Sequence, residues 1–168
     1  MMSVAPTDIL HSVYLFLGSN LGDSASMLYL AKKAICEQIG EIEKSSSLYR
    51  TAAWGKTDQP DFLNQLILVK TKYSPESILQ LGLEIEKQLG RVRKEHWGQR
   101  SIDIDILYYD QVIIKTSTLT IPHSEIQNRK FELIPLVEIS PSFVHPVLQK
   151  TQFELLKECT DQLAVKKL

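Results

Sequence analysis

The chain has 168 residues, of which 43% are hydrophobic and 23% charged, the composition of an ordinary globular domain. Its 19 Lys and Arg residues nearly balance its 20 Asp and Glu residues, so the formal net charge is -1. This balance argues against a protein that coats nucleic acid over a broad surface and against disorder driven by charge. No repeat or linker divides the sequence, so we expect residues 1–168 to form a single domain.

The cysteines and the apolar runs indicate the compartment. Cys36 and Cys159 form no CxxC pattern, which argues against a disulfide scaffold or a zinc module. Residues 1–8 lack the basic and apolar segments of a signal peptide, and runs such as Val13–Leu17 are too short to cross a bilayer. We therefore expect a soluble cytoplasmic protein with reduced thiols.

The first two-thirds of the sequence predicts alternating strands and helices. We expect strands at residues 13–17, 42–52, 62–72 and 102–109. A helix begins after Asp23 and stops at Gly40, and a second begins at Ser74-Pro75 and stops at Gly90. The order β-α-β-β-α-β predicts an α+β, ferredoxin-like core, in which two helices pack on one face of an antiparallel sheet.

The remaining residues predict smaller additions to this core. A short hairpin is expected near residues 112–114 and 119–121. Two C-terminal helices are expected near residues 131–139 and 152–163, and Thr151 with Glu154 matches a capping box for the second.

The densest concentration of charge lies around the fourth strand. Gly90–Arg100 contains four basic residues and one acidic residue, a formal charge of +3, and leads directly to Asp103 and Asp105. Because side chains alternate along a strand, both carboxylates are predicted on one face. A carboxylate pair beside guanidinium groups is typical of a Mg²⁺–polyphosphate site. Aspartates and basic loops are also common on plain solvated surface, so the residues alone leave both interpretations open.

A second cluster surrounds the connection between the second and third strands. Tyr49–Gly55 and Asp58–Asn64 supply aromatic planes and amides suited to a flat heterocycle. Trp54 and Phe62 could equally be core residues.

A third cluster lies between the hairpin and the next helix. In Ile121–Phe131, His123 could donate to a phosphate and Arg129 could assist it. A solitary histidine is more often structural, so this cluster alone assigns no role.

In this order, the three clusters resemble the 6-hydroxymethyl-7,8-dihydropterin pyrophosphokinase family of folate biosynthesis. The resemblance covers about residues 14–141. It rests on Gly18–Gly22, Tyr49–Thr51, Asp58–Asn64, Gly90–Arg93, Trp97–Asp105, Pro122-His123 and Asn128–Phe131.

The resemblance implies a diphosphotransferase that moves the terminal diphosphate of ATP to the pterin hydroxymethyl group and releases AMP. It implies two Mg²⁺ ions held by Asp103 and Asp105. The residues it implies in catalysis are Arg91, Arg93, Arg100, Asp103 and Asp105. Those implied in pterin binding are Thr51, Ala52, Trp54, Phe62, Asn64, Trp97 and Phe131. Those implied in ATP binding are Glu86, Arg91, Arg93, Arg100, Ile106, Thr120, His123 and Arg129.

The implied partners are ATP and the reduced pterin, bound by a monomer without nucleic acid or membrane. Two alternatives share part of the pattern. Single-stranded RNA-binding modules use the same element order, but this sequence lacks their aromatic signature, and paired aspartates would repel phosphates. A metal-dependent phosphodiesterase would explain the aspartates but not the heterocycle cluster.

Overall fold

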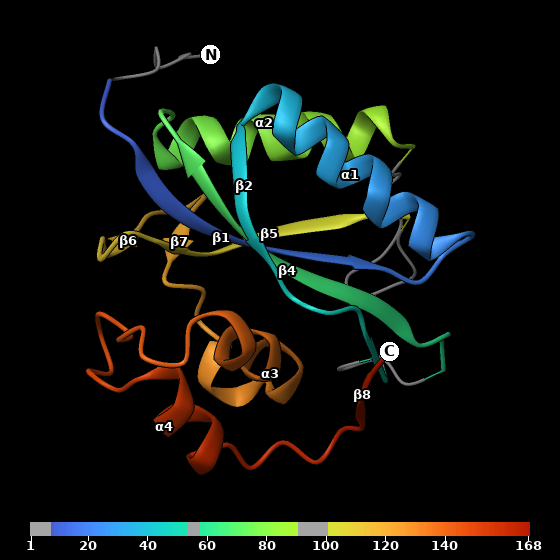
Figure 1. Cartoon of the computed structure of the whole chain (residues 1–168), viewed down its shortest axis with the longest axis vertical. Coiled ribbons are helices and arrows are strands. Elements are labelled where there is room, and N and C mark those ends of the chain that lie inside the picture. The colour runs from blue at the N-terminus through green and yellow to red at the C-terminus, as the bar shows by residue number, and fades with distance from the viewer. Residues whose placement is uncertain (1–7, 54–57, 91–100) are drawn as a thin grey trace.

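The computed structural model describes residues 8–53, 58–90 and 101–168 (Figure 1). One sheet contains β1 (His11–Ser19), β2 (Gly40–Ser45), β3 (Tyr49–Thr51), β4 (Phe62–Thr71), β5 (Asp103–Tyr109) and β8 (Val165–Lys167). The hairpin strands are β6 (Ile114–Lys115) and β7 (Thr120–Ile121). The helices are α1 (Ser24–Gln38), α2 (Pro75–Gln88), α3 (Lys130–Ile139) and α4 (Gln152–Glu158), with a 3₁₀ turn, η1 (Ile126–Asn128).

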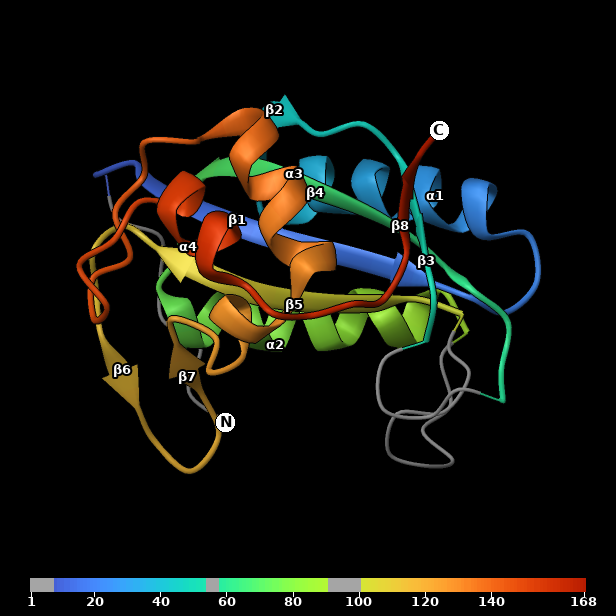
Figure 2. The same ribbon diagram turned by 90° about the horizontal axis from the view of Figure 1, so that it is seen from below.

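The sheet forms the middle layer of the molecule. Its strand order is β5-β1-β4-β3-β8, with β2 also paired to β4, and β1 is antiparallel to both of its neighbours. Helices α1 and α2 cover one face, and α3 and α4 lie against the other (Figures 1 and 2). The predicted ferredoxin-like α+β core, with helical additions near the C-terminus, is confirmed.

Alternation along the central strand divides the core into two parts. Leu15 and Leu17 pack with α1 and α2, whereas Tyr14 and Phe16 pack toward α3. Burying each such side chain stabilises the fold by roughly 1.5–3 kcal/mol. The apolar run at the start of the sequence is therefore a strand buried on both faces.

The helix starts agree with the predicted caps. The Asp23 side chain accepts from Ser26 N, and the Ser74 side chain accepts from Ser77 N. The capping box of Thr151 and Glu154 is formed at the start of α4. These side chains satisfy backbone N–H groups that have no acceptor within the first helical turn.

The predicted helix stop at Gly40 is confirmed, since the C-cap of α1 is Ile39, but Gly40 also has a second role. Helix α1 ends at Gln38, and Gly40 is the first residue of β2, paired with Thr71. A Cβ atom on Gly40 would clash with the carbonyl oxygen of Lys70. Glycine is required here by the close approach of two strands rather than by the helix end.

The single strand predicted over residues 42–52 is two strands. Both β2 and β3 pair with β4, and Ser46 lies between them. The Ser46 hydroxyl accepts from Leu66 N at 3.0 Å, and its carbonyl accepts from the Gln65 amide at 2.7 Å. A side chain that takes over a backbone hydrogen bond interrupts the regular ladder.

The last predicted helix is too long, and the strand after it was not predicted. Helix α4 ends at Glu158, and β8 pairs with the outer edge of β3. Between them, the Asp161 carboxylate accepts from Lys130 N at 3.1 Å and from Leu163 N at 3.0 Å. Asp161 therefore ties this segment to the start of α3 instead of continuing a helix.

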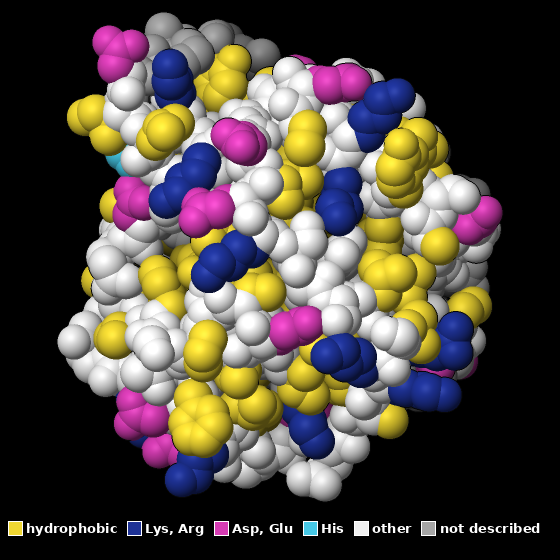
Figure 3. All heavy atoms as spheres, in the orientation of Figure 1, with side chains coloured by type: hydrophobic (Ala, Val, Ile, Leu, Met, Phe, Trp, Pro, Cys, Tyr) yellow, Lys and Arg dark blue, Asp and Glu magenta, His cyan; other side chains and the backbone are white. Residues whose placement is uncertain are grey.

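Charged side chains of both signs are interspersed on the face seen in Figure 3, with no broad patch of one sign. This distribution matches the near-zero net charge. In the part of the chain that the structure describes, no helix is long and apolar enough to cross a membrane.

Candidate active site

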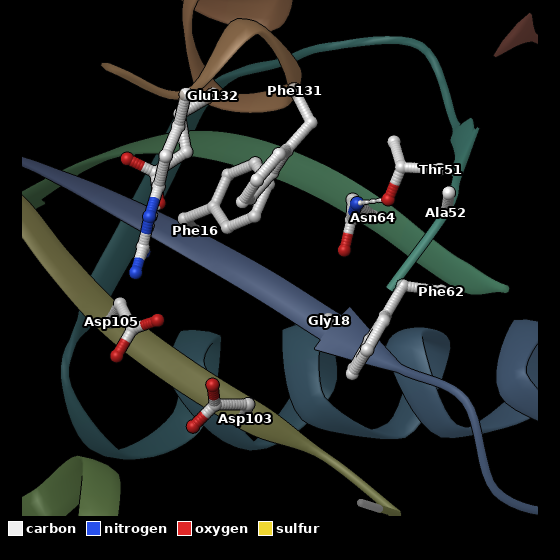
Figure 4. A pocket seen from close by; sticks show the side chains of 11 residues that line it. Phe16, Gly18, Thr51, Ala52, Phe62, Asn64, Asp103, Asp105, Phe131 and Glu132 are labelled. Atoms are coloured by element: carbon white, nitrogen blue, oxygen red, sulfur yellow. Dashed lines mark hydrogen bonds and ion pairs between the residues drawn. The ribbon is translucent and has the colours of Figure 1, made fainter. Parts of the chain in front are cut away.

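The register of the sheet places the two aspartates on the face toward α3. Asp105 pairs with Phe16 and Asp103 pairs with Gly18, while Gly18 pairs with Asn64 on its other side. Paired residues of antiparallel strands share a face. The predicted arrangement is confirmed: both carboxylates point to one side of β5 (Figure 4), and Ile104 packs in the core on the other.

A cavity that opens to solvent lies over this part of the sheet, with a volume of about 550 Å³ when its open mouth is included. It is bounded by the ends of β1, β3, β4 and β5 and by the first turn of α3 (Figure 4). The lining residues are Phe16, Gly18, Thr51, Ala52, Phe62, Asn64, Asp103, Asp105, Arg129, Phe131 and Glu132.

One end of the cavity is acidic. Burial, followed by the neighbouring Asp103 carboxylate, raises the pKa of Asp105 well above its usual value, and Glu132 and Glu86 act in the same direction. The Arg129 guanidinium lowers it. Holding these carboxylates together in ionised form is unfavourable unless a cation compensates for their charge.

The donor set fits a hard divalent cation such as Mg²⁺. Such an ion binds one or two protein carboxylates and completes its shell with phosphate oxygens and water. Among the described residues, no three His, Cys, Asp or Glu side chains are arranged to hold a metal ion. Asp103 and Asp105 could supply two carboxylate ligands to such an ion.

The other end of the cavity carries an amide and aromatic rings. The buried Asn64 donates from Nδ2 to the Thr51 hydroxyl at 2.7 Å, which fixes the amide plane (Figure 4). The rings of Phe16 and Phe131 lie 5.8 Å apart between centroids. Phe62 lines the same end beside Gly18. This end can stack a flat ring and hydrogen-bond its edge.

Arg129 joins the two ends. Its Nη1 donates to Glu132 Oε2 at 3.0 Å, and its guanidinium carbon lies 5.7 Å from the centre of the Phe131 ring. Burial and then the Arg129 charge lower the pKa of His123 to about 4. At neutral pH the His123 ring is therefore uncharged, and its Nδ1 accepts from Glu125 N at 3.2 Å.

Four of the predicted ATP-binding side chains do not line the cavity: Glu86, Ile106, Thr120 and His123. Ile106 is buried among the residues that pack with α1 and α2, and Thr120 is exposed on β7. Glu86 is buried on α2, where its carboxylate accepts from Ile104 N at 2.8 Å. Glu86 thus fixes the backbone between the two aspartates.

Five predicted site residues lie outside the described residues. They are Trp54, Arg91, Arg93, Trp97 and Arg100.

Three lining residues were not predicted as site residues: Phe16, Glu132 and Gly18, although Gly18 belongs to the Gly18–Gly22 motif. Phe16 looked like one more member of an apolar strand, although alternation places it beside Asp105. Glu132 carried a usable signal, because it lies in the helix predicted near residues 131–139 and follows Arg129 by three residues, the spacing of an ion pair.

A family model described as 7,8-dihydro-6-hydroxymethylpterin-pyrophosphokinase matches residues 14–141. The chain is 41% identical over 149 residues to the 2-amino-4-hydroxy-6-hydroxymethyldihydropteridine pyrophosphokinase of Aquifex aeolicus, covering 89% of this chain and 92% of that protein. It is 43% identical over 132 residues to the protein of the same name from Methylorubrum extorquens, covering 78% and 84%.

Solved structures support the fold. The Plasmodium falciparum HPPK-DHPS wild type, crystallised with pteroate, has a TM-score of 0.73 and 19% identity. That match covers 94% of this chain but only 43% of the longer Plasmodium chain. The family model and the close relatives together show that the chain belongs to the 7,8-dihydro-6-hydroxymethylpterin-pyrophosphokinase family.

Proposed function

We propose that the chain transfers the terminal diphosphate of ATP to 6-hydroxymethyl-7,8-dihydropterin in folate biosynthesis. In this reaction the pterin hydroxyl oxygen forms a bond to the β-phosphorus of ATP. The bond from that phosphorus to the α–β bridging oxygen breaks, AMP leaves, and the hydroxyl proton passes to solvent. The observation that supports this proposal is one cavity, with paired carboxylates at one end and aromatic and amide side chains at the other.

Asp103 and Asp105 form the phosphate end of the proposed site. Two Mg²⁺ ions held there with the triphosphate would neutralise phosphate charge and increase the acidity of the pterin hydroxyl. The two side chains lie on one strand whose backbone Glu86 fixes. This rigidity matters because diphosphate transfer depends mostly on positioning and charge, with little need for a protein base.

The pterin is proposed to lie at the aromatic end. Phe131 supplies a stacking ring, and Asn64 reads the polar edge while its Nδ2 is held by Thr51. Ala52 and Phe62 form the wall beside them. By the resemblance to the family, Trp54 and Trp97 are further candidates, and both lie outside the described residues.

ATP binding is proposed to involve the groups on the other side of the aspartates. Arg129 contributes a guanidinium at the cavity, and His123 and Thr120 lie on the segment that leads to it. Glu86 and Ile106 are proposed to support ATP binding indirectly. Glu86 does so through its hydrogen bond to the β5 backbone at Ile104 N, and Ile106 through its packing in the core beneath the same strand. Arg91, Arg93 and Arg100, outside the described residues, are proposed to contact phosphates.

We further propose that residues 1–168 work as one cytoplasmic domain, active as a monomer. Cys36 and Cys159 are both free thiols, which fits a reducing compartment.

Analysis of the products tests this function. Purified protein is incubated with ATP, MgCl₂ and the reduced pterin, and nucleotides are separated by ion-exchange chromatography. We expect equal amounts of AMP and pterin diphosphate. Formation of ADP, or hydrolysis of a model phosphodiester without any pterin product, would contradict the proposal.

Gly18→Ala is expected to weaken pterin binding selectively. Its Cβ would lie 2.9 Å from Asn64 Oδ1, so the amide that Thr51 holds must move. We expect the pterin KM to rise roughly fivefold to tenfold, the effect of about one weakened hydrogen bond, with the KM for ATP unchanged. Steady-state kinetics with each substrate varied in turn measures both.

Gly82→Ala is the matched control for Gly18→Ala. A Cβ on Gly82 meets only Ile104 Cγ2, at 3.8 Å, which is ordinary contact. Because Gly82 lies inside α2, alanine should stabilise the protein by about 0.5–1 kcal/mol and leave both KM values unchanged. An unchanged pterin KM in the Gly18 variant would refute the placement of the pterin beside Asn64.

Deleting residues 164–168 is expected to raise the pterin KM. This change removes β8, which holds the outer edge of β3 just before Ala52, and Leu168 N, which donates to Leu48 O at 2.9 Å. We expect a loss of about 2 kcal/mol of stability, from a few backbone hydrogen bonds, and a pterin KM several times higher. Chemical denaturation and kinetics measure these two effects, and an unchanged KM would show that β8 does not support the cavity wall.

A further inference from the structure

Glu132 is a fully buried carboxylate in the wall of the cavity. It lies in the first turn of α3 with 0% of its side chain exposed, and its Oε2 accepts from Arg129 Nη1 at 3.0 Å. Arg129 is nearly buried as well, with 13% of its side chain exposed. The pair therefore lies at the inner wall, where water screens charge poorly.

The surroundings of Glu132 do not favour a buried, ionised carboxylate. Among the described residues, its second oxygen, Oε1, is buried without a hydrogen-bond partner. Burial raises the pKa of Glu132 to about 7, against the opposing effect of Arg129. A buried ion pair is often no more stabilising than apolar side chains of similar size. The position therefore calls for a reason other than packing.

The backbone holds the pair in a fixed relation. Glu132 N donates to Arg129 O at 3.0 Å, so Arg129 is the N-cap of the helix whose first turn contains Glu132. The first of the two intervening residues is anchored too, since Lys130 N donates to Asp161 Oδ2 at 3.1 Å. An acidic side chain is also favoured at a helix N-terminus by the helix dipole.

Arg129 has a second set of carboxylates within its electrostatic reach. Its positive charge lowers the pKa of Asp105, whereas the like charge of Asp103 raises it, and both aspartates line the same cavity as Arg129. If Glu132 were absent, the nearly buried Arg129 guanidinium would lose one carboxylate partner and would be attracted more strongly to these aspartates. It would then compete with any cation that the aspartates bind.

We propose that Glu132 is a positioning residue that holds the Arg129 guanidinium beside the Asp103–Asp105 pair rather than on it. Asp103 and Asp105 are then less neutralised by Arg129, and their charge is better able to attract the divalent cation. This inference rests on the proposed function, since it assigns Glu132 a part in binding the metal–triphosphate complex.

The first test is a double-mutant cycle on binding. The probe is Mn²⁺ with α,β-methylene-ATP, in which the bond that would break is blocked, and Kd is measured by calorimetry and by electron paramagnetic resonance of free Mn²⁺. Glu132→Leu should raise Kd at least about tenfold, the effect of a lost charged hydrogen bond. Glu132→Gln, which keeps an acceptor for Arg129, should recover most of this loss. Combined with Arg129→Leu, Glu132→Leu should add no further loss.

The second test reads the position of Arg129 directly. In a crystal structure of the Glu132→Leu protein, or of Glu132→Ala if the leucine variant does not fold, the guanidinium should have moved toward Asp105. An unmoved guanidinium, a wild-type Kd, or fully additive losses in the cycle would overturn the proposal.

Controls separate this inference from stability and from the proposed function. Glu138→Gln changes a carboxylate on the same helix that accepts from Ser47 and Tyr49, and it should lower stability without changing Kd. Production of AMP by the wild type tests the proposed function independently, and a wild type that makes AMP while the cycle is additive would reject only the role of Glu132.

Discussion

Replacing Asp105 with asparagine is expected to lower diphosphate transfer roughly 10³-fold, because the site loses half of its carboxylate pair. The folded protein should survive and gain stability. Burial and Asp103 raise the pKa of Asp105, so the folded state binds a proton more tightly than the unfolded state does. The stability of the wild type therefore decreases as pH rises through the folded-state pKa, and the asparagine variant lacks this loss.

Two measurements on the Asp105→Asn protein check this expectation. AMP formation gives activity, and urea denaturation at several pH values without metal gives the free energy of unfolding. Stabilisation by Mn²⁺ with α,β-methylene-ATP should also disappear, since ligand binding to the folded state is what raises its stability.

Asp110→Asn is the matched control, an identical substitution just beyond the other end of the same strand. Asp110 bonds His11 Nδ1 at 2.6 Å and Ser12 N at 2.8 Å, away from the cavity lining. Its positive φ of 48° is tolerated by asparagine. Activity should be unchanged there. Wild-type turnover by the Asp105 variant would refute the proposed metal role of this side chain.

The features that could be predicted from the sequence are those that depend on residues close together in the chain, such as the face of a strand on which a side chain lies or the residue at which a helix begins. Alternation alone places Asp103 and Asp105 on one face and Ile104 on the other, and the structure agrees. The helix starts at Asp23 and Ser74 follow from capping, which depends on residues three positions apart.

The features that sequence reasoning missed depend on contacts between distant segments. β8 forms because it pairs with the outer edge of β3, and the local sequence of Val165–Lys167 does not predict that pairing. Gly40 follows the end of α1 as predicted, but a glycine is required there because β2 passes very close to the backbone of Lys70, a contact fixed by strand pairing. Ser46 similarly breaks a strand only because Leu66 lies opposite its hydroxyl.

Replacing Asn64 with leucine is expected to raise the pterin KM roughly 10- to 100-fold, since a polar edge of the ring would be buried without its partner. Asn64 is buried and donates from Nδ2 to the Thr51 hydroxyl. Its acceptor, Oδ1, lies next to Gly18, which lines the cavity. Leucine is similar in size, so the cavity keeps its shape while losing the acceptor. Binding of Mn²⁺ with α,β-methylene-ATP should change little, because the phosphate end is formed by other strands.

Gln38→Met is the control for the Asn64→Leu variant, because it removes an amide of the same kind from the exposed face of α1. Gln38 donates only to Gln88 at 3.1 Å among the bonds described for it, far from the cavity lining. Both KM values should stay at wild-type levels there. Calorimetric binding of the pterin to the Asn64 variant separates affinity from turnover. A wild-type pterin Kd would refute the assignment of Asn64 to the ring edge, whereas an equal loss for both substrates would indicate that the change damages the sheet rather than one end of the site.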